Sequence, residues 1–217
     1  MEPSGTLRFA ASSTFAQLYV APLLPEFLEL HPGISLDLRF TDLQLDLIEG
    51  SFDLALRNST LADSSLKARK LADDHRVLCA SPGYLEKYGT PSDPNDLHDH
   101  QLIAFRNQLA RELIGPGGPA GQFDPRNANC RIVVDDGASM RIATVSGAGI
   151  SMNGLWSVHR EIKDGELVRV LPDYVVDHHA ALWLVYPKSN VLTAKVRVLI
   201  DFLLERIGRS PPWLREL

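Results

Sequence analysis

The order of strand-like and helix-like segments is the feature that most constrains this chain. Short apolar runs typical of strands alternate with helical patterns: Leu7–Ala11 precedes a helical stretch from Phe15, and Ile34–Phe40 and Phe52–Leu56 are the next two strands. Successive β-α-β units imply parallel strands with right-handed crossovers. The sequence therefore predicts an α/β protein.

The residue pattern of each early strand also predicts its place in the sheet. Ile34–Phe40 alternates strictly between apolar and polar residues, whereas Phe52–Leu56 is almost continuously apolar. A strand covered on both faces is apolar throughout, so the second pattern predicts a central strand and the first an edge strand. We expect the strand order 2-1-3, with the first and third strands as neighbours.

Two helices are predicted between these strands. The first runs on from Phe15, and Pro22 and Pro25 interrupt its apolar spacing. Proline lacks the N–H that a helix interior needs, so a kink or a restart is expected near residues 20–24. The second helix is predicted over Asp42–Glu49.

The remaining chain continues the alternation. Further strands are predicted at residues 66–71, 76–80, 100–105, 130–134, 150–152, 167–171 and 181–186. Further helices are predicted at residues 83–88, 137–146, 156–164 and 193–207. Residues 115–129 are rich in Gly, Pro and Asn, a composition typical of surface loop.

A coarse internal echo predicts two lobes. The succession of strand, polar crossing, strand and helix occurs over residues 66–88 and again over 167–207. Two α/β lobes joined by two crossing strands, near 73–76 and 174–180, require this succession, and the last strand and helix then return to the first lobe. The expected boundaries are residues 5–74 plus 180–207 for lobe I and 75–179 for lobe II.

Composition narrows the possible partners. The net charge is −5, with 45% hydrophobic and 23% charged residues, so the chain is an ordinary globular protein without the basic balance of a DNA-binding domain. The cysteines, Cys79 and Cys130, lie in apolar runs and are expected to be buried thiols in a reducing compartment. The N-terminus lacks a signal-peptide pattern, and no apolar run could span a membrane. We expect a cytoplasmic protein.

Polar residues follow the predicted strands of lobe I. Ser12, Ser13 and Thr14 lie where the first strand gives way to a helix, Thr41 ends the second strand and Arg57 ends the third. Ligands of open α/β sheets bind at the carboxyl ends of strands, and two lobes would present those ends to a shared cleft. Helix N–H groups, hydroxyls and a guanidinium favour an anion such as a carboxylate. Helix capping, a turn residue and a solvated strand-end charge are the alternatives.

The corresponding strand ends of lobe II carry a mixed set of residues. Phe105, Asp136, Gly137 and Asn153 are the candidates for ligand contact. Asp135 and Asp136 are also typical helix N-caps, which is the more frequent role of such residues. If one of these carboxylates faces the ligand, the effector carries hydrogen-bond donors.

Other constellations do not support a catalytic or metal centre. His98, His100 and the pair at 178–179 lack the spacing of metal ligands. Val145–Gly149 lacks the first glycine of a hydrolase nucleophile elbow and the third glycine of a dinucleotide fingerprint. We therefore predict no catalytic residue, no metal and no cofactor.

The ordered set of segments resembles the effector-binding domain of LysR-type transcription regulators. The segments are GTLRFAASSTFAQLYVAPLLPEFLELHPGISLDLRF, DLIEGSFDLALR, SSLKARKLADDHRVLCASPGYLEKYGTP, VSGAGIS, DGELVRVLPDY and WLVYPKSNVLTAKVRVLIDFLLERI. Together they span residues 5–207. One departure is Met152-Asn153-Gly154, where the family often has a proline.

The resemblance implies a type 2 periplasmic-binding-protein-like fold, with two Rossmann-like subdomains joined by two crossing strands. It implies a sensor that binds a small metabolite between its lobes and controls transcription, not an enzyme. It also implies a homodimer, tetrameric when full length, whose contacts include the helices after Ser13 and Asp136. DNA would be bound only through an N-terminal winged helix-turn-helix. That domain is absent here, so we expect a truncated chain with an added Met1. The alternatives are a free solute-binding protein of a transporter and an enzyme on the same scaffold.

Overall fold

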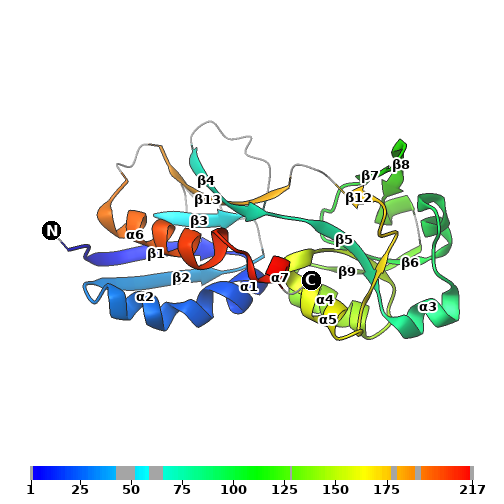
Figure 1. The fold of residues 1–217 in the computed structure, drawn as a ribbon, viewed down its shortest axis with the longest axis horizontal. Helices are drawn as coiled ribbons and strands as arrows, with labels where there is room; N and C mark the ends of the chain where they lie inside the picture. Colours follow the sequence, from blue (N-terminus) through cyan, green and yellow to red (C-terminus); the bar gives the residue numbers. More distant parts are fainter. Residues whose placement is uncertain are drawn as a thin grey trace. The chain divides into compact units, whose positions relative to one another are not determined.

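Two separate sheets organise the chain (Figure 1). The computed structural model describes residues 2–42, 52–58, 66–127, 129–176, 180–188 and 192–215. The chain divides into two compact units, of which the first combines Met1–Asp73 with Ala180–Arg215 and the second is Asp74–His179. The predicted α/β class with two sheets is confirmed.

The sheet of the first unit has the strand order β2-β1-β3-β13-β4. Its strands are β1 (Gly5–Ala11), β2 (Ile34–Phe40), β3 (Leu54–Arg57), β4 (Leu66–Asp73) and β13 (Ala181–Pro187). β1 pairs in parallel with β2 and with β3, whereas β13 is antiparallel to β3 and β4. The predicted order 2-1-3 is confirmed, with β2 at an edge of the described sheet and β3 inside it.

The first helix of this unit is built from several helical segments in succession. It begins as α1 (Ser13–Phe15), widens to a π-helix over Ala16–Val20, tightens to a 3-10 helix over Ala21–Leu23 and continues as α2 (Leu24–Leu30). The predicted restart near residues 20–24 is confirmed, since the 3-10 segment contains Pro22 and α2 has a proline in its first turn. The helix predicted over Asp42–Glu49 lies, apart from Asp42, outside the described residues.

The last helix returns to the first unit as the sequence predicts. It consists of α6 (Ala194–Leu203) and a π-helical turn, Leu204–Gly208, and is followed by the short α7 (Pro212–Arg215). The predicted apolar stripe is buried: Val196, Leu199, Ile200, Leu203 and Ile207. This burial is the main driving force for docking an amphipathic helix against a sheet.

The second unit has the strand order β8-β7-β12-β5-β10-β6-β9, with β11 also paired to β5. Its strands are β5 (Arg76–Ala80), β6 (Gln101–Phe105), β7 (Arg111–Gly115), β8 (Gly118–Phe123), β9 (Asn129–Val134), β10 (Ile150–Gly154), β11 (Val168–Val170) and β12 (Val175–Val176). Its helices are α3 (Pro82–Tyr88), α4 (Gly137–Val145) and α5 (Leu155–Lys163), with 3-10 segments at Pro94–Asp99 and Pro125–Asn127.

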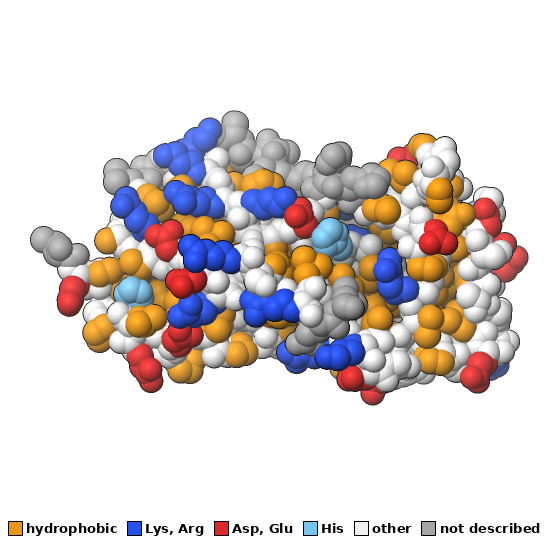
Figure 2. Space-filling model, in the orientation of Figure 1, with side chains coloured by type: hydrophobic (Ala, Val, Ile, Leu, Met, Phe, Trp, Pro, Cys, Tyr) orange, Lys and Arg blue, Asp and Glu red, His pale blue; other side chains and the backbone are white. Residues whose placement is uncertain are grey.

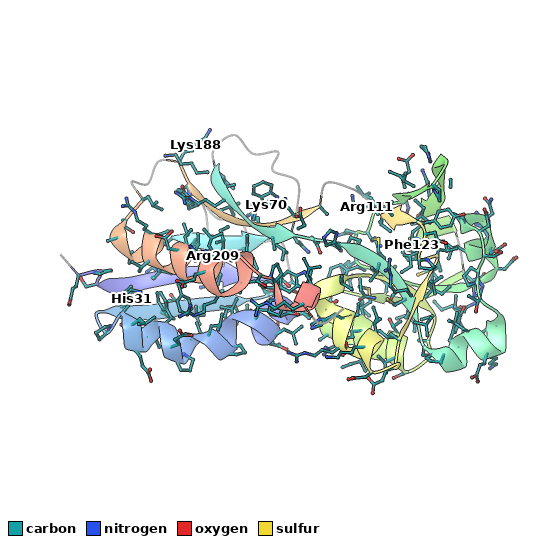
Figure 3. The ribbon with its side chains drawn as sticks, viewed as in Figure 1. His31, Lys70, Arg111, Phe123, Lys188 and Arg209 are labelled. Carbon is teal, nitrogen blue, oxygen red and sulfur yellow. The ribbon has the colours of Figure 1, made fainter. Side chains whose placement is uncertain are left out.

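The surface loop predicted over residues 115–129 is wrong. β7 and β8 form an antiparallel hairpin in which Arg111 pairs with Phe123, and both residues are labelled in Figure 3. Gly118 has φ +109°, a backbone conformation that glycine supplies at the turn. Leu113 and Phe123 are fully buried and anchor the two strands. The Gly and Pro residues thus form a hairpin and its turn, and the buried apolar residues on either side of the turn hold the two strands in the sheet.

No helix in the described part of the chain is long and apolar enough to cross a membrane.

Candidate functional site

Three parallel strands of the first unit end at one edge of its sheet. Ala11 of β1 is level with Phe40 of β2, so Ser12 and Thr41 follow side by side. The Thr41 N–H donates to the Ala11 carbonyl at 3.0 Å. Ala10 is level with Ala55 of β3, which places Arg57 two residues further on, as Ser12 is on β1. The structure therefore brings the predicted residues of this unit to one carboxyl-end edge.

A carboxylate that the sequence analysis missed lies at the start of the first helix. The Ser13 N–H donates to Oδ1 of Asp42 at 2.8 Å, and the Ser13 hydroxyl accepts a hydrogen bond from Gln17 Nε2 at 3.1 Å. In the described residues the Ser12 side chain makes no capping hydrogen bond. The signal for Asp42 was its position directly after Thr41. The Asp42 carboxylate therefore already accepts a hydrogen bond from one of the N–H groups at this helix start.

Thr14 presents an unusual hydroxyl at the same helix start. The residue is 2% exposed, and Oγ1 is buried without a hydrogen-bond partner among the described residues. Buried polar atoms are nearly always hydrogen-bonded in folded proteins, because leaving one without a partner costs about 1–3 kcal/mol. Among the described residues, Thr14 is thus an exception to this rule.

Arg57 completes this edge with a positive charge. It is the last residue of β3, is half-buried and is level with Trp183 on β13. A guanidinium carries five donors in a planar fork that matches a carboxylate.

The second unit has an equivalent edge. β6 is parallel to β9, with Phe105 level with Val134, and β10 is parallel to β6, with Ser151 level with Ile103. Asn153 is thus two residues past Ser151, as Phe105 is past Ile103. Phe105 and Asn153 thus lie in the last residues of neighbouring strands, and Asp136 and Gly137 follow the end of β9.

Asp136 acts as the N-cap of α4. Its side chain accepts a hydrogen bond from the Ser139 N–H at 2.8 Å, and Gly137 is the first residue of the helix. The hydrogen bonds from Ser139 lower the pKa of the Asp136 carboxyl from its ordinary value. The neighbouring Asp135 lies 3.6 Å from Arg106 in an exposed ion pair. The capping interpretation of Asp136 is confirmed.

Asn153 occupies a buried position on β10. It is 1% exposed, and its Nδ2 donates to the Ser151 hydroxyl at 2.7 Å. The Ser151 hydroxyl lies 2.6 Å from Oγ1 of Thr144 on α4, and both residues are fully buried. The sequence analysis missed this polar chain. The available signal was the i, i+2 spacing of Ser151 and Asn153, which places them on one face of a strand.

Comparisons with known proteins place this architecture in a family. The family model of the LysR substrate binding domain matches residues 1–208. The chain belongs to this family. The resemblance noted in the sequence is thereby confirmed.

Relatives of this LysR-family domain are named as transcription regulators. An HTH-type transcriptional regulator of Xanthomonas campestris is 34% identical over 215 residues, covering 95% of this chain and 60% of that protein. The HTH-type transcriptional activator AaeR of Escherichia coli is 36% identical over 203 residues, covering 93% and 64%. The chain thus spans about two thirds or less of the length of these curated relatives.

Solved structures of the family have the same fold. The regulatory domain of CrgA from Neisseria meningitidis matches with a TM-score of 0.82 at 30% identity, covering 95% of this chain and all of that one. Full-length AphB from Vibrio cholerae matches with a TM-score of 0.82 at 28% identity, covering 95% of this chain and 70% of that one.

The histidines of this LysR-family domain do not gather into a metal site within the described residues. His100 is buried and its Nδ1 lies 3.1 Å from the Tyr84 hydroxyl. Burial lowers the pKa of His100 from its ordinary value, which favours the neutral ring. His178 and His179 lie outside the described residues. His100 is a structural histidine that packs α3 against β6.

Proposed function

We propose that this LysR-family domain is the ligand-sensing regulatory part of a transcription regulator. A small metabolite with an anionic or strongly polar group binds at the carboxyl-end edges of the sheets, and its binding controls DNA binding and transcription by the full-length protein. The family match over residues 1–208 is the observation that carries this proposal.

The chemistry of the first edge supports an anionic or polar ligand group. The Ser13 N–H donates to the Asp42 carboxylate, a place that a ligand carboxylate would have to take over, and the Thr14 hydroxyl is buried with no partner among the described residues. Arg57 adds a guanidinium at the end of the neighbouring β3. Hydroxyl donors, helix N–H groups and a positive charge together favour negative charge.

The carboxyl-end edge of the sheet in the second unit would supply further contacts to the same ligand. Phe105 offers an apolar ring, Gly137 a helix start and Asn153 an amide. Asp136, whose carboxylate accepts from Ser139, would favour an effector that carries hydrogen-bond donors. These roles are part of the same proposal.

A homodimer is the proposed assembly, with a tetramer for the full-length protein. The helices after Ser13 and Asp136 are the proposed contacts, and both expose apolar side chains: Leu30 of α2 is 57% exposed and Ile142 of α4 is 60% exposed. A two-fold dimer would bury such side chains on both copies. Sedimentation showing a strict monomer at high concentration would contradict this assembly.

DNA contact is proposed to occur only through a domain outside this chain. Figure 2 shows lysine and arginine side chains gathered over the first unit with acidic side chains between them. Lys70 lies 2.5 Å from Asp73, and Lys195 lies 2.9 Å from Asp53. Paired charges release few counterions, so this chain alone should not shift duplex DNA in a gel at physiological salt.

The names of the relatives favour a cytoplasmic sensor over the two other candidates, a free solute-binding protein and an enzyme on the same scaffold. The relatives are transcriptional regulators and regulatory domains. The test is a thermal-shift screen of metabolites, because a ligand that binds only the folded state raises its stability by RT ln(1 + [L]/Kd). Metabolites that stabilise the domain, and do so without being turned over, support the proposal. Turnover of a stabilising metabolite would favour the enzyme.

A further inference from the structure

We propose that Thr144 and Ser151 are positioning residues that fix the amide of Asn153, so that the edge of the second unit reads a hydrogen-bond donor on the effector. The inference rests on the proposed function and narrows its ligand class. The effector would be a small carboxylate that also carries a hydroxyl or amino group.

The direction of each hydrogen bond follows from the last acceptor in the chain. Oγ1 of Thr144 donates to the Met140 carbonyl at 2.7 Å, and a carbonyl oxygen can only accept. The single hydroxyl proton of Thr144 is therefore used. At the 2.6 Å contact between the two hydroxyls, Ser151 must donate and Thr144 must accept.

The same accounting determines the orientation of the Asn153 amide. The Ser151 proton is committed to Thr144, so the Ser151 oxygen can only accept, and Nδ2 of Asn153 donates to it at 2.7 Å. A flipped amide would place Oδ1 against an oxygen with no proton to offer. Thr144 and Ser151 are 0% exposed, so no bulk water reaches the Ser151 oxygen to relieve that repulsion.

In this orientation the amide oxygen is the branch of the planar amide that does not contact Ser151. Ser151 lies two residues back along β10 from Asn153, which is at the level of the strand end. Because Nδ2 is held toward Ser151, Oδ1 points the other way. An amide oxygen is an acceptor only, so its complement is a donor. A site built to bond such a donor discriminates against a ligand that lacks it.

The test uses pairs of carboxylates that differ by one hydroxyl: lactate with propionate, and malate with succinate. The Asn153 side-chain amide resonances are followed in ¹⁵N-labelled protein during titration. We expect one hydroxy acid of the pairs to shift them with a dissociation constant about tenfold lower than its deoxy partner, the effect of one hydrogen bond. Equal affinities within both pairs, or no shift of these resonances by any of the four, would overturn the inference.

The positioning role is separated from a purely structural one by variants. Ser151→Ala and Thr144→Val interrupt the series of hydrogen bonds from Thr144 to Asn153 and should abolish the tenfold preference. Thr144→Ser keeps a hydroxyl and should retain the preference. Ser157→Ala is the matched control, since Ser157 is a buried serine whose hydroxyl donates to the Gly154 carbonyl at 2.9 Å and takes no part in the hydrogen bonds from Thr144 to Asn153. A preference that survives in folded Ser151→Ala contradicts the inference, and this variant decides if Thr144→Val folds poorly.

Failure of the inference is distinguishable from failure of the proposed function. Backbone resonances of Ser13 and Thr14 report the edge of the first unit in the same titrations. Shifts at Ser13 and Thr14 without shifts at Asn153 would support an effector site in the first unit and would contradict the proposed contact between the Asn153 amide and a donor on the effector. If the metabolite screen also finds no stabilising ligand, the proposed function itself fails.

Discussion

Nε1 of Trp156 donates a hydrogen bond of 2.9 Å to Oδ1 of Asp74, whose side chain is fully buried. The other carboxylate oxygen of Asp74 accepts from Nε of Arg76 at 2.8 Å. The Leu155 N–H also donates to the His75 carbonyl at 2.7 Å. The segment directly after Asn153 thus holds residues 74–76, where the chain enters the second unit. Asn153, which we propose to contact the effector, is therefore two residues from Leu155, whose N–H bonds the segment where the chain enters the second unit.

Replacing Trp156 should expose how much this contact stabilises the second unit. Trp156→Phe removes the indole donor and leaves Oδ1 of the buried Asp74 without it. An unsatisfied buried acceptor costs about 1–3 kcal/mol, more when the group is charged. We expect a lower free energy of unfolding in urea, beyond the loss caused by the smaller ring.

Trp213 provides the matched control, because its indole is also buried but differs in its polar contact. It is 0% exposed, packs against Phe15 and Tyr19 with ring centroids 6.0 and 4.9 Å away, and its Nε1 has no partner among the described residues. Trp213→Phe removes a similar volume but no hydrogen bond, so it should destabilise less than Trp156→Phe. Equal losses in the two variants would show that the Asp74 contact contributes little.

Asp136 should give the second unit a pH-dependent stability. The hydrogen bonds from Ser139 lower the pKa of Asp136 in the folded state. Its contribution is therefore complete above the ordinary Asp pKa of about 3.9 and disappears as pH falls through the lower, folded value. Asp136→Asn keeps a capping side chain but cannot ionise, so its difference from the wild type should shrink as pH falls below about 4.

Two further variants check this assignment. Asp136→Ala removes the cap at every pH and should cost about 1 kcal/mol in denaturant unfolding. Asp135→Asn alters only an exposed ion pair with Arg106, which contributes little. A pH profile that changes as much in Asp135→Asn as in Asp136→Asn would be inconsistent with the capping role.

The two cysteines should differ sharply in reactivity. Cys79 is buried on β5, and burial raises the pKa of its thiol to about 12. Cys130 is partly exposed on β9. Because the thiolate is the reactive form, a disulfide reagent at pH 8 should label Cys130 in the native protein and Cys79 only after unfolding. Equal labelling rates would mean that β5 opens readily.

The sequence predicts β2 and β3 well, because the burial of each strand determines the local pattern of apolar and polar residues along it. The alternation of Ile34–Phe40 places β2 at an edge of the described sheet, and the apolar Phe52–Leu56 places β3 inside it. The hairpin of β7 and β8 is missed, because Gly and Pro dominate the composition of residues 115–129 while its strands depend on Leu113 and Phe123 packing in tertiary structure. Long-range burial is not visible in local composition.

The sequence predicts which residues of the candidate site lie at strand ends, but it does not predict the hydrogen bonds between their side chains. Positions such as Ser12, Thr41 and Arg57 follow from topology alone, since parallel strands end at one edge. The Asp42 contact to Ser13 and the chain from Asn153 to Thr144 depend on side-chain geometry across 29 and 9 residues of sequence. Sequence position places Asp42 just after the end of β2 and the i, i+2 pair of Ser151 and Asn153 on one face of β10, but it does not determine which hydrogen bonds these side chains make.

Arg57 gives the sharpest test of the effector site in the first unit. It is half-buried at the end of β3, whose parallel neighbour β1 leads into the hydroxyl-bearing helix start. The next parallel strand, β2, leads into Thr41. Arg57→Ala removes charge-assisted hydrogen bonds of about 1.5–3 kcal/mol to an anionic effector. This predicts a dissociation constant roughly 10- to 150-fold higher in calorimetry with the metabolite that the screen finds. Ser13→Ala should weaken the same binding less, because a neutral hydroxyl contributes less than a charged donor.

Arg69→Ala is the matched control, since Arg69 is an exposed arginine on β4 of the same unit. The thermal unfolding of all three variants without ligand should stay close to that of the wild type, because strand-end and surface side chains contribute little to the core. Unchanged affinity in both Arg57→Ala and Ser13→Ala, with folding preserved, would remove the proposed site and point to an apolar pocket or a partner-binding surface.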